Sequence, residues 1–172
     1  FKIMGVTPLT GSYRFNKKIG KSVWHPELPE WAGTYDSDKY YKVYREGCKE
    51  MGKQTAGYVQ LWQVSNEMDI HIFRGPMTIK QTARFLKEGS LGIKEGNPEV
   101  KTSINPAGLS TDGRWLFENL YTKSEKTFDY AGIDGYFGSW VPGSPESWPP
   151  LLEEIHRITN VPIVIHEWGY SS

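Results

Sequence analysis

Two glutamates stand directly after apolar, strand-like runs of this sequence, the place where parallel strands present reactive groups. Glu67 follows residues 58–64 (YVQLWQV), and Glu167 follows residues 161–165 (VPIVI). The 100 residues that separate them correspond to about three βα units of roughly 30 residues each. In a closed barrel, strands three positions apart face each other, so the two carboxyls would meet above a bound substrate. A pair roughly 5–5.5 Å apart, one protonated and one ionised, can cleave a glycosidic bond with retention.

The elements that would position this pair alternate between strand-like and helical patterns. The strand-like runs cover residues 1–9, 58–64, 100–105, 131–137 and 161–165, and helical patterns cover residues 39–52 and 114–121 and begin at Thr78 and Ser144. Strands joined by crossovers of helix length, without a two-residue hairpin signal, predict a parallel sheet of the α/β class. Doubly wound sheets and (β/α)8 barrels both fit this alternation. The sequence contains no phosphate-cradling glycine motif, which favours the barrel.

Several local signals define the expected helices and loops. Asp38 is the expected N-cap of the first helix, whose apolar side chains recur at i, i+4 and i+8. Thr78 and Gln81 form a T-x-x-Q capping box for the second helix. Cys48 falls on the apolar face of the first helix, so we expect a small buried residue rather than a nucleophile. Residues 10–37 are expected to form a long polar and aromatic loop.

Two motifs resemble those of clan A glycoside hydrolases, which are retaining enzymes with a (β/α)8 fold. Residues 62–70 (WQVSNEMDI) resemble the strand-four motif, in which an Asn-Glu pair supplies the acid/base. Residues 161–172 (VPIVIHEWGYSS) resemble the strand-seven motif, in which the nucleophilic Glu is followed by an aromatic residue and Gly. The resemblance implies that Glu67 is the acid/base and Glu167 the nucleophile. It also implies that Asn66 binds the sugar 2-hydroxyl.

The resemblance spans nearly the whole chain but only strands three to seven of a barrel. It places Tyr136 where many clan members have a strand-six tyrosine that hydrogen-bonds the nucleophile, although Phe137 and Trp140 compete for the same region. We therefore expect residues 1–172 to be part of a single (β/α)8 catalytic domain of about five βα units. This part lacks strands one, two and eight, and with them the usual strand-two Arg and strand-eight aromatic platform. Because open parallel edges are unfavourable, we expect flanking sequence or a second chain to complete the barrel.

Tryptophans near the predicted strand ends are candidates for stacking on sugar rings. Trp140 and Trp168 directly follow the sixth and seventh strands of this frame. For Trp24 and Trp31 in the long loop, stacking on sugar and packing within the loop are both open. Strict strand alternation points His166 away from Glu167, which indicates a solvent-facing or supporting role rather than metal binding.

Composition narrows the set of partners. The chain has 20 basic and 20 acidic residues, and this zero net charge argues against nucleic acid. No apolar stretch reaches the roughly 20 residues that span a membrane. Its single cysteine excludes an internal disulfide, so the cysteine count does not indicate whether the protein works in a reducing or an oxidising compartment. A secreted or extracellular location is slightly favoured. No spaced set of ligands predicts a metal, and the expected reaction needs no cofactor. An oligo- or polysaccharide is the expected partner.

Two other functions stay open beside hydrolysis of β-linked glycans through a glycosyl-enzyme intermediate. A non-catalytic carbohydrate-binding domain derived from a barrel would hold glycans on its aromatic residues without cleaving them. A barrel aldolase or isomerase would need a strand-end lysine or phosphate-site glycines, which the sequence lacks. The two motifs are shared by enzymes acting on xylan, mannan, galactan and glucan, so they indicate no particular sugar.

Overall fold

A parallel sheet of five strands forms the centre of the computed structural model, which describes residues 2–122 and 127–169. The strands lie in the order β1-β4-β5-β6-β7, and each neighbouring pair is parallel. Their bounds are Ile3–Val6 (β1), Val59–Gln63 (β4), Lys101–Ile104 (β5), Tyr130–Gly135 (β6) and Ile163–Trp168 (β7). Each strand overlaps one of the predicted runs. Their spatial order follows the chain, as in the wall of a barrel, whereas the order of a doubly wound sheet reverses at a switch point.

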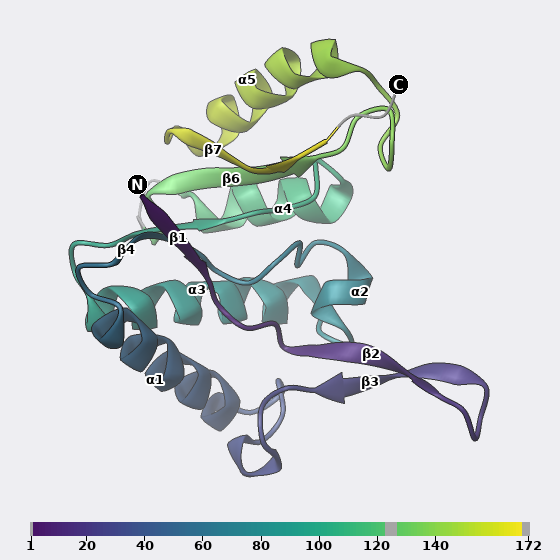
Figure 1. Ribbon diagram of the computed structural model, residues 1–172, viewed down its shortest axis with the longest axis vertical. Helices are drawn as coiled ribbons and strands as arrows, with labels where there is room; N and C mark the ends of the chain where they lie inside the picture. Colours follow the sequence, from purple (N-terminus) through teal and green to yellow (C-terminus); the bar gives the residue numbers. More distant parts are fainter. Residues whose placement is uncertain (1, 123–126, 170–172) are drawn as a thin grey trace.

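Helices lie along the outer side of this curled sheet and connect its strands (Figure 1). The long helices are α1 (Asp38–Gln54), α3 (Ile79–Gly96), α4 (Thr111–Leu120) and α5 (Trp148–Thr159). The short ones are α2 (His71–Arg74) and the 3-10 turns η1 (Glu30–Ala32) and η2 (Pro145–Ser147). Helix α1 packs on α3, α3 on α4, and α4 on α5, so the outer layer follows the strands in chain order. The arrangement is that of about half a (β/α)8 barrel.

The hydrophobic core lies between the sheet and these helices. Its fully buried side chains include Phe85 of α3, Phe117 of α4, Ile133 of β6 and Ile155 of α5. Cys48 of α1 is also fully buried, and burial raises the pKa of its thiol to about 12. This confirms the expectation of a small buried residue, because a thiol with such a pKa is not a nucleophile at neutral pH.

The segment expected as a loop over residues 10–37 contains an antiparallel hairpin, so that expectation was wrong in part. Strand β2 (Gly11–Asn16) pairs with β3 (Lys21–Pro26) across a connection over residues 17–20. The connection ends at Gly20, whose φ of 63° is a left-handed conformation that glycine adopts readily. A connection of this length lacks the two-residue turn signature, which is why the sequence pattern did not indicate a hairpin. Figure 1 shows the hairpin extending away from the sheet.

The capping signals are confirmed for α3 and corrected for α1. Thr78 Oγ1 accepts from the Gln81 N–H at 3.3 Å, and Gln81 Oε1 accepts from the Thr78 N–H at 2.8 Å. For α1 the N-cap is Ser37 rather than Asp38, since Ser37 Oγ accepts from the Tyr40 N–H at 3.4 Å. Ser37 has the extended backbone of an N-cap, whereas Asp38 is already the first helical residue.

Strands β1 and β7 form the two edges of the sheet. On β1, Ile3 is 51% exposed and Val6 is 49% exposed, and on β7, Ile165 is 42% exposed. Parallel strands are normally covered on both faces. The described part of the chain therefore leaves apolar surface uncovered at both edges.

Candidate active site

Carboxyl and amide side chains gather where strands β4 to β7 end. Glu67 follows β4, Asn105 follows β5, Asp134 lies in β6 and Glu167 lies in β7. The carboxyl ends of parallel strands lie on the same side of a sheet, which brings these residues together. Their negative charges interact, because Glu167 raises the pKa of both Glu67 and Asp134. The structure thus brings the two glutamates singled out in the sequence into one site.

Glu67 is a buried carboxyl on a strained turn. Its φ is 40°, and two residues earlier Ser65 has a φ of 64°; both are left-handed conformations that cost energy in residues other than glycine. The side chain is 7% exposed. Burial, together with the negative charges of Asp69 and Glu167, raises the pKa of Glu67 to about 7. Glu67 can therefore hold a proton near neutral pH, as a general acid must.

A row of amide side chains fixes the orientation of Asn66. Asn66 Oδ1 accepts a hydrogen bond from Gln63 Nε2 and another from Asn105 Nδ2, each at 2.9 Å. Both bonds use the carbonyl oxygen, which leaves the Asn66 amide N–H₂ group to donate elsewhere. Asn105 Oδ1 in turn accepts from the Glu67 backbone N–H at 3.3 Å. One amide thus links the Asn-Glu pair to β5.

Glu167 is held by the tyrosine that directly follows β6. Tyr136 donates its hydroxyl hydrogen to Glu167 Oε2 at 2.8 Å. This bond is the one that the resemblance implied for a strand-six tyrosine. The carboxylate of Glu167 raises the pKa of Tyr136 to about 12, so the phenol keeps its proton and remains a donor.

A β-bulge between β6 and β7 changes the direction expected for His166. Ile133 pairs with Ile165, but Asp134 pairs with Glu167, so His166 is the extra residue of the bulge. Its Nε2 lies 2.8 Å from Ser103 Oγ on β5. The ring therefore contacts β5, which fits the supporting role and not the solvent-facing one. Burial lowers the pKa of His166 to about 4.

Asp134 and Asn105 belong to the site although the sequence reasoning did not single them out. Asp134 is 1% exposed, and Asn105 is 2% exposed. Asp134 Oδ2 accepts from Asn105 Nδ2 at 2.7 Å. A signal did exist, because Asn105 is the last residue of the predicted run 100–105 and Asp134 is the one charged residue of the predicted run 131–137.

The tryptophans proposed to bind sugar are placed differently from one another. Trp140 is 78% exposed and lies 4.7 Å from Tyr136 between ring centroids, and Trp168 at the end of β7 is 73% exposed. Both therefore offer apolar surface next to the Tyr136–Glu167 pair. Trp24 lies in the hairpin, packed edge-on against Tyr13 at 5.1 Å.

The glycines around Trp24 indicate an anchoring contact. A Cβ added at Gly11 or at Gly75 would lie 2.6 Å or less from indole carbon atoms of Trp24. The indole therefore packs within the hairpin, at Gly11, and also ties the hairpin to the turn after α2, at Gly75. Trp31 is 64% exposed in η1.

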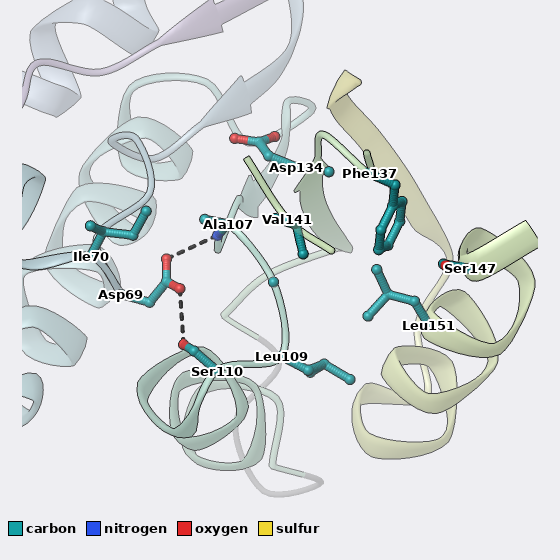
Figure 2. Close-up of a pocket in the computed structure, with 12 residues that line it drawn as sticks. Asp69, Ile70, Ala107, Leu109, Ser110, Asp134, Phe137, Val141, Ser147 and Leu151 are labelled. Atoms are coloured by element: carbon teal, nitrogen blue, oxygen red, sulfur yellow. Dashed lines mark hydrogen bonds between the residues drawn. The ribbon is translucent and has the colours of Figure 1, made fainter. Parts of the chain in front are cut away.

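A cavity of about 670 Å³ lies beside the carboxyls of Asp69 and Asp134 (Figure 2). Its wall is mainly apolar, with Ile70, Leu109, Phe137, Val141 and Leu151 among the lining residues, and it includes Asp69 and Asp134. Asp69 accepts from the Ala107 N–H at 3.0 Å and from Ser110 Oγ at 3.2 Å, as Figure 2 shows. These bonds tie the loop after β4 to the loop after β5. The volume is within the range of small-molecule sites.

Residues 2–122 and 127–169 contain no group of three or more His, Cys, Asp or Glu side chains arranged to hold a metal ion. Within the same residues, no helix combines the length and the apolar character needed to cross a membrane.

The fold matches solved structures, whereas no family model and no curated protein matches the sequence. The GH53 catalytic domain of Ignisphaera aggregans aligns with a TM-score of 0.65 and 20% identity, over 81% of this chain and 40% of that one. A glucosidase from Croceicoccus marinus aligns with a TM-score of 0.61 and 13% identity, over 77% and 31%. The chain is a partial (β/α)8 barrel. A β-glucuronidase of Bacteroides uniformis aligns over 84% of this chain with a TM-score of 0.58 and 18% identity.

These comparisons confirm the predicted fold class and concern the fold alone. The chain spans 17% of the Bacteroides uniformis protein, 31% of the Croceicoccus marinus protein and 40% of the Ignisphaera aggregans domain. These three neighbours are glycosidases by name, and what they share with this chain is the fold.

Proposed function

We propose that this chain carries the catalytic pair of a glycoside hydrolase that cleaves β-linked glycans with retention. The observation that supports this most is the joint placement of Glu67 and Glu167 at the ends of β4 and β7, where their charges interact. Burial favours the protonated form of Glu67, and a phenol donates to Glu167. Retaining hydrolysis needs these two states of a carboxyl pair.

In the first step, Glu67 acts as the acid and Glu167 as the nucleophile. A Glu167 carboxylate oxygen forms a bond to the anomeric carbon while the bond from that carbon to the leaving oxygen breaks. The proton of Glu67 passes to the leaving oxygen, so the aglycone departs as a neutral alcohol. Tyr136 holds the attacking carboxylate in place through its 2.8 Å hydrogen bond.

In the second step, water releases the sugar. The Glu67 carboxylate takes a proton from a water molecule, whose oxygen attacks the anomeric carbon and breaks its bond to Glu167. Both side chains return to their starting protonation states. Two inversions at the anomeric carbon give net retention.

Substrate contacts come from the residues around this pair. The free amide N–H₂ of Asn66 donates to the sugar 2-hydroxyl, a contact that strengthens as the ring flattens in the transition state. The exposed indoles of Trp140 and Trp168 stack on sugar rings next to Glu167. No step requires a cofactor or a metal.

The test uses glutamate variants of the complete protein and a panel of aryl and oligosaccharide β-glycosides. Glu167→Ala should abolish hydrolysis of every substrate. Glu67→Ala should reduce turnover of substrates with poor leaving groups by about 10²–10⁴-fold. It should still release an activated phenol in a burst, because that leaving group needs no proton.

Glu99→Ala, at an exposed position before β5, is the matched control and should leave activity unchanged. Full activity of either active-site variant would contradict the proposal. Proton NMR of the first-formed product should show the β-anomer, and the α-anomer would exclude retention.

A carbohydrate-binding domain without hydrolysis is the second candidate. The exposure of Trp140 and Trp168 favours it, because exposed indoles serve binding as well as catalysis. Calorimetric binding of an oligosaccharide by the complete protein, without release of reducing sugar, would support this candidate over the enzyme.

A further inference from the structure

A third carboxyl, Asp134, lies between the proposed acid and the proposed nucleophile. On β6 it stands directly opposite Glu167 of β7 in the strand register. The ion pairs formed by the described Lys and Arg residues, such as Arg74 with Asp112, do not include Glu67, Asp134 or Glu167. Three carboxyls therefore share this space without a balancing cation from the described residues.

One side-chain amide, that of Asn105, donates a hydrogen bond to the carboxyl of Asp134. Asp134 Oδ2 accepts one hydrogen of Asn105 Nδ2 at 2.7 Å, and the other hydrogen goes to Asn66 Oδ1 at 2.9 Å. Asn105 Oδ1 accepts the Glu67 N–H at 3.3 Å. Since a primary amide has two N–H donors and one carbonyl, Asn105 has a partner for each of its groups. Asp134 thus sets the rotation of the amide that orients both Asn66 and Glu67.

The other oxygen of Asp134 has no such contact. Oδ1 is buried and has no hydrogen-bond partner, and the side chain as a whole is 1% exposed. Asp134 borders the cavity but exposes almost none of its surface, so it acts through its neighbours. A buried carboxylate with one oxygen unpartnered would cost more than a neutral carboxyl in the same place.

The carboxyls that face Asp134 favour its neutral form. The hydrogen bond from Asn105 and the backbone N–H of Glu167 favour the ionised form, but burial and the two carboxyls outweigh them. Glu67 after β4 and Glu167 on β7 both place negative charge near it, and Tyr136 at the end of β6 stays a neutral phenol. His166, also on β7, is neutral at neutral pH. Burial, with these two charges, raises the pKa of Asp134 to about 8.

We infer that Asp134 is a positioning residue for the proposed glycosidase reaction. Its neutral carboxyl anchors Asn105, and through Asn105 it keeps Asn66 turned towards the sugar and holds the backbone of Glu67 in its left-handed conformation. The catalytic effect of Asp134 rests on the proposed function. The hydrogen bonds from Asp134 through Asn105 to Asn66 can be tested whether or not the protein is a glycosidase.

The kinetic test compares Asp134→Asn with Asp134→Ala in the complete protein. Asparagine retains an oxygen for the Asn105 donor and carries no charge, so activity at pH 6 should stay within about threefold of the parent. Alanine leaves the donor of Asn105 without its acceptor, and kcat should fall about 10–100-fold with little change in KM, the size expected when a buried donor is left without a partner. Equal damage by both substitutions would overturn the inference.

The pH profile separates positioning from a merely structural role. In the parent, log(kcat/KM) should fall above pH 8 with a slope approaching −2, as Glu67 and then Asp134 lose their protons. The slope should be −1 in Asp134→Asn. Asp69→Asn is the matched control, because Asp69 is buried near Glu67 but bonds to Ala107 and Ser110 instead of Asn105. This control should keep the parent slope, and an unchanged slope in Asp134→Asn would overturn the inference.

Side-chain amide NMR distinguishes failure of this inference from failure of the proposed function. The N–H₂ resonances of Asn105 and Asn66 should titrate together near pH 8 in the parent and stop titrating in Asp134→Asn. If no glycoside is cleaved but these resonances titrate, the proposed function fails while the positioning role of Asp134 stands. If glycosides are cleaved but the resonances do not respond, the positioning role fails alone.

Discussion

Single side chains of the candidate site differ mainly in how far water reaches them. Glu67 is 7% exposed and Asp134 is 1% exposed, and burial is the largest cause of their raised pKa values. Glu167 is half-buried and accepts a hydrogen bond from Tyr136. One residue type can thus supply an acid on one strand and a nucleophile on another, because the surroundings decide which form is stable.

The protonation of Glu67 should set the alkaline limit of activity. Because the acid must hold its proton, we expect kcat/KM to fall as pH rises through about 7. Removing the charge of Asp69 in Asp69→Asn takes away one of the causes that raise this pKa, so the limit should move to lower pH. The measurement is a pH–rate profile of both proteins, and a limit that moves to higher pH would contradict the assignment of Glu67.

The phenol of Tyr136 should matter to kcat. Tyr136→Phe removes one hydrogen bond to a charged carboxylate, which is worth about 1.5–3 kcal/mol, or roughly 10–150-fold in rate. We expect kcat to fall within this range in steady-state kinetics. The matched control is Tyr130→Phe, which makes the same substitution at the opposite end of β6. Unchanged kcat in Tyr136→Phe would contradict its role.

Asp134 should also make folding stability depend on pH. Its folded pKa of about 8 lies above the ordinary value of 3.8, so the folded state binds the extra proton between these values. The free energy of unfolding should therefore fall as pH rises from about 4 to about 8. Asp134→Asn removes this contribution and should raise the free energy of unfolding at pH 8 by on the order of 2 kcal/mol, allowing for relaxation around the charge. Urea unfolding at pH 5 and pH 8 checks this, and a parallel decline in both proteins would refute it.

At the scale of elements, helices α1 and α3 cross closely because glycine lines their contact. A Cβ at Gly92 would lie 2.3 Å from the Arg45 carbonyl oxygen, and a Cβ at Gly96 would lie 2.0 Å from the Lys49 carbonyl oxygen. Side chains at these positions would push the helices apart. Helix α3 in turn packs on β5, whose end is followed by Asn105.

Two glycine-to-alanine substitutions test this crossing. Gly92→Ala should lower the free energy of unfolding by about 1–3 kcal/mol, because the methyl group overlaps the backbone of α1. Gly47→Ala, in α1 with no atom within 4 Å of the added Cβ, should instead raise it by up to about 1 kcal/mol through helix propensity. Denaturant unfolding of both variants decides, and equal effects would show that the crossing tolerates a larger separation.

At the scale of the whole molecule, the half-barrel has two uncovered edges. Strands β1 and β7 each have one neighbour, and their apolar side chains Ile3, Val6 and Ile165 are exposed. We propose that further strands pair with both edges and complete one (β/α)8 domain. Flanking sequence or a second chain would supply them, since parallel strands are stable when covered on both faces.

The polypeptide of residues 1–172, prepared alone, should therefore self-associate or bind a hydrophobic dye. Light scattering after size exclusion measures its mass, and hydrogen exchange measures protection of the β1 and β7 amides. A monodisperse monomer near 19.7 kDa with protected edge amides would contradict this proposal.

The amino-acid sequence by itself determined the order of the elements and the two strand-end glutamates. Apolar runs, capping signals and helical spacing are local properties, so the parallel strands and the capping box at Thr78 were predictable from them. The placement of Tyr136 beside Glu167 also followed, through the family resemblance. Where a local signal was ambiguous, the prediction failed: the hairpin over residues 11–26 was expected as a loop, and the N-cap of α1 was expected one residue too late.

Only the tertiary structure decided which polar groups share the buried space between the strand ends. The bulge at His166 depends on how β6 and β7 pair, which strand alternation cannot indicate. Asp134 and Asn105 enter the site because β5 and β6 end beside Glu67 and Glu167, far apart in sequence. Their protonation and hydrogen bonding follow from burial and neighbouring charge, and both are properties of the packed molecule rather than of any residue alone.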